Sequence, residues 1–281
     1  MLLSVDNLSF SYPNTPVLEE ITFSVNDADF VSIVGPNGSG KTTLLRLLDR
    51  ILVPRGGAVQ FKDRPLQDYT RPELARSISY VPQETSWVFP FTVLDVVLMG
   101  RSPHLGQRIF EGAGDIRIAR EAMELVDVAR LADHPITGIS GGERQRVLIA
   151  RALAQEPVMV LLDEPNAHLD LSHQLEIFSI LRDRNRERGL TVISVSHDLN
   201  LAAAFSSHVL LLAQKPFSAG EESAPCTVLA YGTPREVLTP RRLQESFGAR
   251  VLVDRHPTVG SPRITLDPTT LDRKKGSHDD V

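Results

Sequence analysis

The chain has 281 residues, of which 42% are hydrophobic and 23% are charged, so it can form a substantial hydrophobic core. Its formal net charge of −5 disfavours proteins whose main task is to grip the phosphate backbone of nucleic acid. The single cysteine, Cys226, excludes a framework of intrachain disulfides and suits a reducing compartment.

The apolar runs and the opening segment bear on a membrane role. The chain contains no apolar run of about 18 residues, so we expect it not to span a bilayer. The opening segment MLLSVDNLSFSYP carries Asp6 and has no basic start, which is not typical of a signal peptide. Any membrane role therefore requires a partner that crosses the bilayer.

The first part of the chain predicts strands followed by one helix. Residues 2–12 and 21–27 alternate apolar and polar side chains, as half-buried strands do. Residues 29–35 are more continuously apolar, which indicates a buried parallel strand. A mostly buried helix follows, and then a turn and a strand at 54–61. The apolar residues assigned to this helix are Leu44, Leu45, Leu47, Leu48, Ile51 and Leu52.

Residues 92–155 predict a block of helices. The first helix, 92–101, begins with Thr92 as N-cap and Asp95 three residues later. Further helices are expected at 114–133 and 143–155. After the block, strands at 157–165, 190–197 and 208–214 alternate with helices at 171–188 and 198–206. This alternation predicts a parallel sheet that is covered by helices on both faces, with the helical block inserted into it.

The pattern weakens from Lys215 onward. Residues 215–226 form a predicted polar loop, and 228–232 a short strand. Residues 233–248 indicate one or two short helices separated by Pro240. The last ten residues, 272–281, are charged and have no apolar face, so we expect them to be disordered.

A glycine-rich segment after the strand at 29–35 matches the phosphate-loop pattern GxxxxGK[ST]. Its glycines allow backbone amides to surround phosphate oxygens, and the helix that follows directs its positive end at the same anion. Lys41 would add a charge at the β- and γ-phosphates, and the hydroxyl of Thr42 would bind Mg²⁺. The predicted ATP-binding residues of this loop are Gly35, Pro36, Asn37, Gly38, Ser39, Gly40, Lys41, Thr42 and Thr43.

Two acids end the apolar segment at 158–164. Asp163 is expected at the carboxyl end of a core strand beside the phosphate loop, where it can hold Mg²⁺ directly or through water. Glu164 follows at once and could act as general base toward the attacking water. A kinase would also need a site for an acceptor substrate, whereas a hydrolase needs only water and a base, which Glu164 fits.

A second glycine-rich segment, ISGGERQRV at 139–147, indicates another anion site at a helix N-terminus. Ser140 can cap this helix, Gly141 and Gly142 allow close approach of the backbone, and the helix is predicted to begin at Glu143. A chain that binds one nucleotide has no need of two helix N-termini that bind anions.

The segments GPNGSGKTT, VPQ, ISGGERQR, VLLDEP and SVSHD follow one another in an order and rough spacing that resemble an ABC-type ATPase domain, over residues 1 to about 250. The resemblance implies an α/β fold: a P-loop NTPase core with a mainly parallel sheet, an N-terminal antiparallel β subdomain and an inserted helical subdomain. It also implies a head-to-tail dimer with ATP and Mg²⁺ as cofactors. The residues of one copy that would close on the ATP of the other are Ser140, Gly141, Gly142 and Glu143.

The same resemblance assigns roles to four further residues. Gln83 is similar to the glutamine that contacts Mg²⁺ and the attacking water, and His197 to the switch histidine at the γ-phosphate. Asp170 resembles the aspartate that crosses the dimer interface, and Tyr12 the aromatic residue that stacks on adenine. Ile139 stands where the family usually has leucine, a conservative change that should only repack an apolar contact. An active ATPase is therefore expected.

The segment between Lys41 and Ser140 has no heptads and is too short for the long coiled coil of chromosome-type relatives. The chain also contains one cassette, whereas translation-factor relatives carry two. A transporter motor is therefore favoured. Residues 84–106 resemble cassettes of iron–siderophore, haem and cobalamin importers. Trp87, Phe89 and Phe91 form an apolar group in a predicted surface loop, which suggests contact with a permease. The alternative interpretation is that these aromatics pack the helical insertion onto the core. Molybdate import, export and a non-transport ATPase remain as alternative functions.

The expected organisation follows from this interpretation. Residues 1–250 would form a single ABC ATPase domain, with a helical subdomain at about 90–155, and 251–281 a C-terminal extension. The expected partners are a second copy of the chain, an integral-membrane permease dimer and, indirectly, an extracytoplasmic solute-binding protein, with no nucleic acid. The chain would lie peripherally on the cytoplasmic face of the inner membrane.

Overall fold

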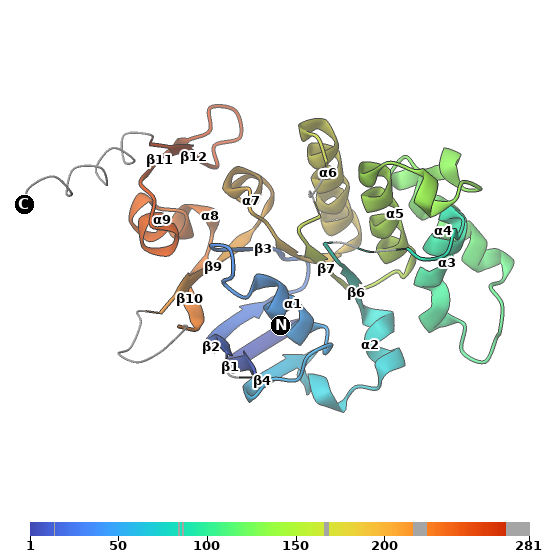
Figure 1. Ribbon diagram of the computed structural model, residues 1–281, viewed down its shortest axis with the longest axis horizontal. Helices are drawn as coiled ribbons and strands as arrows, with labels where there is room; N and C mark the ends of the chain where they lie inside the picture. Colours follow the sequence, from blue (N-terminus) through green and yellow to red (C-terminus); the bar gives the residue numbers. More distant parts are fainter. Residues whose placement is uncertain (14, 84, 86, 166–168, 216–223, 268–281) are drawn as a thin grey trace, which may run out of the picture.

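The computed structural model describes residues 1–281 except 14, 84, 86, 166–168, 216–223 and 268–281. Within the described residues, ten strands form one sheet in the order β5-β4-β1-β2-β10-β9-β3-β8-β7-β6 (Figure 1). Its strands are β1 (Leu3–Tyr12), β2 (Thr15–Val25), β3 (Phe30–Val34), β4 (Gly56–Phe61), β5 (Arg64–Pro65), β6 (Ile78–Val81), β7 (Met159–Asp163), β8 (Thr191–Val195), β9 (His208–Gln214) and β10 (Cys226–Gly232). Among these residues, no helix combines the length and the apolar character needed to cross a membrane.

The sheet has an antiparallel part and a parallel part. Strands β1, β2, β4 and β5 pair antiparallel, and the alternation of β1 buries Leu3 and Val5. Strands β6, β7, β8, β3 and β9 are parallel. All five residues of β3 are buried, because helices cover both faces of this part. The predicted α/β fold with a mainly parallel sheet and an N-terminal antiparallel part is confirmed.

Alternate residues of the parallel strands enter two different cores. Met159 and Leu161 of β7 pack with helix α1 (Lys41–Leu48), whereas Val160 and Leu162 pack with the helices on the other face. Helix α1 is shorter than the sequence predicts, because the chain leaves it at Asp49. The prediction that Ile51 and Leu52 belong to this helix is wrong, and Ile51 is 47% exposed.

The helices predicted at 92–155 lie beside β6 and β7, to the right in Figure 1. They are α3 (Val93–Leu98), η2 (Met99–His104), α4 (Ala113–Leu125), η3 (Ala129–Leu131), η4 (Ile136–Gly138) and α5 (Gly141–Ala154). The predicted capping box of Thr92 and Asp95 is present. Helix α4 ends before residue 133, because Asp127 adopts a left-handed backbone with φ 53°. Helix α5 begins at Gly141 and not at Glu143.

Helix α2 (Arg71–Ser77) and the short strand β6 were not predicted. A short helix, η1 (Leu66–Asp68), comes before α2 in the chain. The remaining helices are α6 (Leu171–Arg188), α7 (Leu199–Phe205), α8 (Pro234–Val237) and α9 (Pro240–Phe247). The predicted break at Pro240 is confirmed, because Pro240 is the first residue of α9. The division into a domain at 1–250 with a subdomain at 90–155 stays a prediction.

The C-terminal region contains a hairpin that the sequence analysis did not anticipate. Strands β11 (Val251–Arg255) and β12 (Pro262–Leu266) pair antiparallel. Asn200 on α7 binds the hairpin through both backbone groups of Ile264, at 2.8 and 3.2 Å. Most of the polar loop predicted at 215–226 and the disorder predicted at 272–281 fall outside the described residues.

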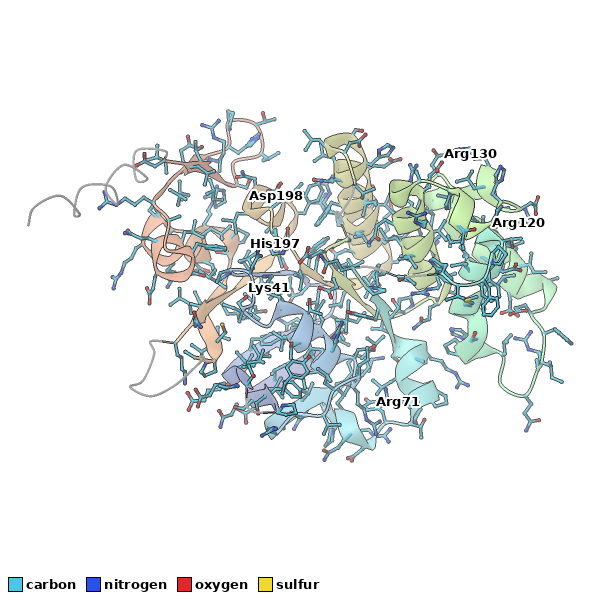
Figure 2. All side chains as sticks on the ribbon, viewed as in Figure 1. Lys41, Arg71, Arg120, Arg130, His197 and Asp198 are labelled. Carbon is cyan, nitrogen blue, oxygen red and sulfur yellow. The ribbon has the colours of Figure 1, made fainter. Side chains whose placement is uncertain are left out.

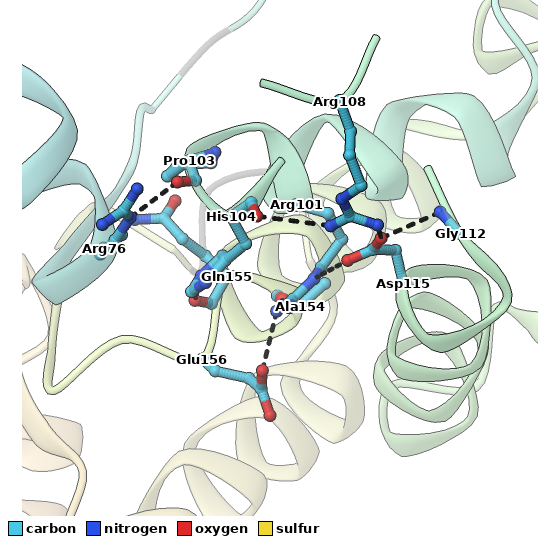
Figure 3. A network of polar contacts seen from close by, with 10 residues as sticks. All are labelled: Arg76, Arg101, Pro103, His104, Arg108, Gly112, Asp115, Ala154, Gln155 and Glu156. Atoms are coloured by element: carbon cyan, nitrogen blue, oxygen red, sulfur yellow. Dashed lines mark hydrogen bonds and ion pairs between the residues drawn. The ribbon is translucent and has the colours of Figure 1, made fainter. Parts of the chain in front are cut away.

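A buried ion network joins η2 to α4 and α5 (Figure 3). Arg101 is 5% exposed, and its Nε donates to Asp115 Oδ1 at 3.2 Å. Its Nη1 donates to the carbonyl of Ala154 at 2.7 Å and to Glu156 at 2.8 Å. Arg108 pairs with the other oxygen of Asp115 at 2.9 Å. The hydrogen bond from the Gly112 amide, together with the two arginines, lowers the pKa of Asp115 to about 2, so this buried carboxylate stays charged.

Side chains next to this network bind α2 and β6 (Figure 3). Arg76 on α2 donates to the carbonyl of Pro103 at 2.8 Å, and His104 contacts the carbonyl of Gln155 at 2.8 Å. The amide of Gln155 in turn donates to backbone carbonyls of α2 and β6, at 2.5 and 2.7 Å. The helical block is thus fixed to the strand that leads to Gln83.

Arg101→Met should lower the free energy of unfolding by about 3 kcal/mol, because it leaves Asp115 with less compensation for a buried charge. Urea denaturation of the purified chain measures this change. Arg117→Met is the matched control, since Arg117 forms an exposed pair with Glu121 one helical turn away and should give no measurable change. Equal unfolding midpoints for the two variants would contradict the structural role of Arg101.

Candidate active site

The segment between β3 and α1 forms a tight loop. Gly40 has φ +83°, a left-handed conformation that favours glycine, and a Cβ atom there would lie 2.7 Å from Leu18 Cδ2. The loop therefore needs glycine both for its backbone conformation and for space. Ser39 is buried, and its hydroxyl has no hydrogen-bond partner within the described protein. A buried polar atom without a partner is typical of a site that receives a polar ligand.

The N-terminus of α1 is open to an anion. No side chain caps it, and its first turn contains no acidic residue. The amide groups of this turn are therefore free of the protein contacts that usually satisfy them. Two of the three ammonium hydrogens of Lys41 are used by the carbonyls of Gly35 and Pro36, at 3.0 and 2.9 Å. Within the described residues the third hydrogen has no acceptor and can reach a ligand. Burial lowers the pKa of Lys41, and the charges of Glu164 and Asp163 oppose this effect.

Thr42 and Asp163 come together as a pair of oxygen ligands. The Thr42 hydroxyl donates to Asp163 Oδ1 at 2.9 Å, although β8 lies between β3 and β7 in the sheet. Burial raises the pKa of Asp163, and the hydrogen bonds from Thr42 and Tyr80 oppose this rise. Magnesium prefers oxygen ligands and usually takes one or two carboxylates together with phosphates. These two residues therefore fit the predicted metal site.

Glu164 lies between two side chains that come from other strands. Gln83 Nε2 donates to Glu164 Oε2 at 2.9 Å, and His197 Nε2 lies 2.5 Å from Glu164 Oε1. The three residues follow β6, β7 and β8, whose carboxyl ends share one edge of the sheet. Glu164 has φ 51°, a conformation that a non-glycine residue adopts at some energetic cost and that is frequent at functional sites.

These residues line one open cleft of about 610 Å³, a volume within the usual range for ligand sites. Figure 2 shows Lys41 and His197 near the centre of the molecule, and both line this cleft. Of the predicted residues, the structure brings together Tyr12, Asn37, Gly38, Ser39, Gly40, Lys41, Thr42, Thr43, Gln83, Glu164 and His197. Gly35, Pro36 and Asp163 do not line the cleft themselves, but the carbonyls of Gly35 and Pro36 accept from Lys41, and Asp163 accepts from Thr42.

Tyr12 stands at the mouth of the cleft. Its side chain is 39% exposed, and its ring makes an edge-to-face contact with Phe10 at a centroid distance of 5.0 Å. Val17 from β2 lines the cleft beside it. Tyr12 thus lines the cleft, and its stacking on adenine stays a prediction.

The second glycine-rich segment does not reach this cleft. Ser140 caps α5: its hydroxyl accepts from the Glu143 amide at 3.2 Å, and Glu143 accepts from the Ser140 amide at 3.0 Å. Hydrogen bonds from Ser140 and the nearby Arg130 lower the pKa of Glu143 to about 2. None of the four predicted residues from Ser140 to Glu143 lines the cleft of its own chain. Asp170 is also outside it and caps α6 by accepting from the His173 amide at 3.0 Å.

The aromatic residues predicted to contact a permease differ in exposure. Trp87 is half-buried and packs against the core of the helical block, as the alternative interpretation expected for all three. Phe89 is 65% exposed and Phe91 39%, and the Phe91 ring contacts both other rings edge-to-face, at 6.1 and 6.5 Å. Phe89 is therefore the residue of this group that is open to a partner.

Sequence reasoning missed Tyr80 and Arg46. The hydroxyl of Tyr80 donates to Asp163 Oδ2 at 3.1 Å, and burial raises the pKa of Tyr80 to about 12. Arg46 lies four residues after Thr42 on α1, and its charge opposes the rise that burial causes in the pKa of Tyr80 and of Asp163. The spacing of Thr42 and Arg46 could have indicated a shared helix face, but nothing local in the sequence points from Tyr80 to Asp163.

Known proteins resemble this chain over most of its length. The ABC transporter family matches residues 18–167, which include the phosphate loop, Gln83, Ser140 and Glu164. The ferric enterobactin transport ATP-binding protein of Escherichia coli (strain K12) is 35% identical over 92% of this chain and 92% of its own. The hemin import ATP-binding protein of Gloeobacter violaceus is 40% identical over 88% of each chain. A solved dimeric ATP-binding cassette in a post-hydrolysis state, bound to ADP and Pi, has 27% identity and a TM-score of 0.69, covering 83% of this chain and 99% of its own.

Proposed function

This chain belongs to the ABC transporter family of ATP-binding subunits, and we propose that it powers import of a ferric siderophore, haem or cobalamin through a separate permease. The observation that carries the ATPase part is the position of Glu164, held by Gln83 and His197 at the edge of the phosphate-loop cleft. The choice of solute rests on relatives named for the transport of ferric enterobactin and hemin.

In the proposed reaction, the cleft binds ATP through the open N-terminus of α1, with the free hydrogen of Lys41 directed at the β- and γ-phosphates. Thr42 and Asp163 would hold Mg²⁺, which neutralises charge on the phosphate oxygens when bound. Glu164 accepts a proton from the attacking water. Gln83 and His197 orient the Glu164 carboxylate, so that the main contributions to catalysis are positioning and charge stabilisation.

The cleft of one chain is half of the proposed active site. The N-terminus of α5, with Ser140, Gly141 and Gly142, lies outside the cleft of its own chain. In a head-to-tail dimer this helix end would face the γ-phosphate bound by the other copy, and Asp170 would lie at the interface. A related cassette is dimeric in its solved structure with ADP and Pi, which supports the pairing of two copies. Closure of the dimer would then move the permease.

Phe89 is the proposed anchor for the permease, because it is a large exposed apolar residue in the segment that resembles importer cassettes. Binding there would hold the chain on the cytoplasmic face of the inner membrane. The solute would reach the permease from an extracytoplasmic binding protein, which this chain does not contact.

Two measurements test this function. Cells that lack the gene for this chain should lose uptake of one labelled solute among ferric siderophores, haem and cobalamin, and the intact gene should restore it.

Phe89→Ser should fold and bind ATP normally but co-purify less with the permease, since it loses a buried apolar contact at the interface. Trp87→Ser is a poorer test, because Trp87 also packs the helical block.

Leu252→Ser is the matched control for Phe89→Ser, because Leu252 is an exposed apolar residue of the C-terminal hairpin. It should leave co-purification unchanged. Undiminished assembly of Phe89→Ser with the permease would rule out the proposed contact. Normal uptake of all three solute classes in the deletion strain would rule out the proposed substrate range.

A further inference from the structure

Tyr80 contacts the carboxylate at the centre of the proposed metal site, and the reaction described above makes no use of this contact. Tyr80 lies on β6, which pairs with β7 in register, with Tyr80 opposite Leu161. Its ring packs in the core between the sheet and α1, and its hydroxyl reaches the end of β7, where it lies 3.1 Å from Asp163 Oδ2. The contact therefore joins neighbouring strands just before both enter the active site.

The chemistry of the carboxylate determines the direction of this hydrogen bond. An ionised carboxylate oxygen can only accept, so the Tyr80 hydroxyl donates its proton to Asp163 Oδ2. Arg46 and Thr42 lie one turn apart on the same face of α1. Thr42 thus supplies the donor to Asp163 Oδ1 from α1, while Tyr80 supplies the donor to Asp163 Oδ2 from β6.

The two oxygens of Asp163 are consequently held by different elements. Thr42 on α1 binds Oδ1, and Tyr80 on β6 binds Oδ2, so the carboxylate has no freedom to rotate about its terminal bond. We propose that Tyr80 is a positioning residue that keeps Asp163 Oδ1 turned toward Thr42, so that the two form a preorganised oxygen pair for the divalent cation that accompanies ATP. This inference rests on the proposed function, and it assigns to Tyr80 a role in metal affinity. Residues that orient metal ligands in this way typically change metal affinity 10–100-fold when they are removed.

Tyr80→Phe tests the role of the hydroxyl, because phenylalanine keeps the ring packing. The full chain is titrated with a non-hydrolysable ATP analogue in EDTA and over a range of Mg²⁺ concentrations, and Mn²⁺ binding is followed by electron paramagnetic resonance. In EDTA, the affinity for the analogue should match that of the wild type. The concentration of Mg²⁺ or Mn²⁺ needed for half-maximal effect should rise roughly 10–100-fold.

Tyr231→Phe is the matched control. Tyr231 is another partly buried tyrosine, whose hydroxyl donates to the Ser24 carbonyl at 2.5 Å and whose pKa burial likewise raises to about 12, but it does not line the cleft. This variant should show wild-type metal dependence.

The outcomes separate this inference from the function on which it rests. If the wild type depends on Mg²⁺ as expected and Tyr80→Phe shows the same metal dependence, only the role of Tyr80 would be overturned. An equal loss of affinity in EDTA and in Mg²⁺ would overturn it too, since it would indicate a merely structural role. If the affinity of the wild-type protein for the analogue were the same in EDTA and in Mg²⁺, the proposed function would be overturned, and the role of Tyr80 with it.

Discussion

Glu164→Gln is expected to bind ATP with near wild-type affinity and to lose roughly 10²–10⁴-fold in turnover, the usual contribution of a positioned general base. Glutamine has the shape of glutamate and can keep contacts with both Gln83 and His197, but its amide cannot take a proton from water. The change therefore removes the base and leaves the architecture of the site. Steady-state phosphate release gives turnover, and equilibrium titration gives affinity.

Glu187→Gln is the control for this prediction, because Glu187 is an exposed acid of α6 that lies outside the cleft. It should leave both turnover and affinity unchanged. Near-normal hydrolysis by Glu164→Gln would show that another group accepts the proton. If Glu164→Gln lost affinity for ATP as well, Glu164 would have a role in shaping the loop.

Lys41→Ala is expected to weaken ATP binding roughly 10–100-fold, because a hydrogen bond to a charged group contributes about 1.5–3 kcal/mol. The ammonium group has two roles in the structure. It binds the carbonyls of Gly35 and Pro36, which shapes the loop, and it keeps one hydrogen for the phosphates. Calorimetric titration at fixed salt concentration measures the loss, since ionic strength screens the charge that is removed.

Lys62→Ala provides the comparison for Lys41→Ala. Lys62 lies beyond β4, with its ammonium 5.5 Å from the centre of the Phe61 ring, and it does not line the cleft. Its removal should leave ATP affinity unchanged. Equal ATP affinities for Lys41→Ala and the wild type would contradict the assignment of the phosphate loop itself.

The phosphate loop and the acids at 163 and 164 could be predicted because their signals are local. A glycine pattern between a buried strand and a helix specifies the loop wherever it occurs, and an apolar run that ends in two acids specifies the end of a core strand. Gln83 and His197 needed the family resemblance, because a single polar residue after a strand carries no signal of its own. The structure brings both to Glu164 because parallel strands end at one edge of the sheet.

Other elements could not be predicted for identifiable reasons. Strand β6 has four residues and α2 seven, which is too short for a clear period. Ile51 and Leu52 continue the apolar pattern of α1, yet the helix has already ended at Leu48. Trp87 and Phe89 look alike in the sequence, but one packs on the helical block and the other is exposed.

The sequence by itself determined the family of this protein, because each of its five motifs is local and their order can be read along the chain, and it named the residues proposed to handle phosphate. The tertiary structure alone decided which distant side chains meet. It joined Tyr80 to Asp163 and Arg101 to Asp115, and it kept Ser140 away from the cleft of its own chain. These contacts depend on strand order and helix packing, and no local pattern of residue types encodes the distance between two atoms that are far apart in the chain.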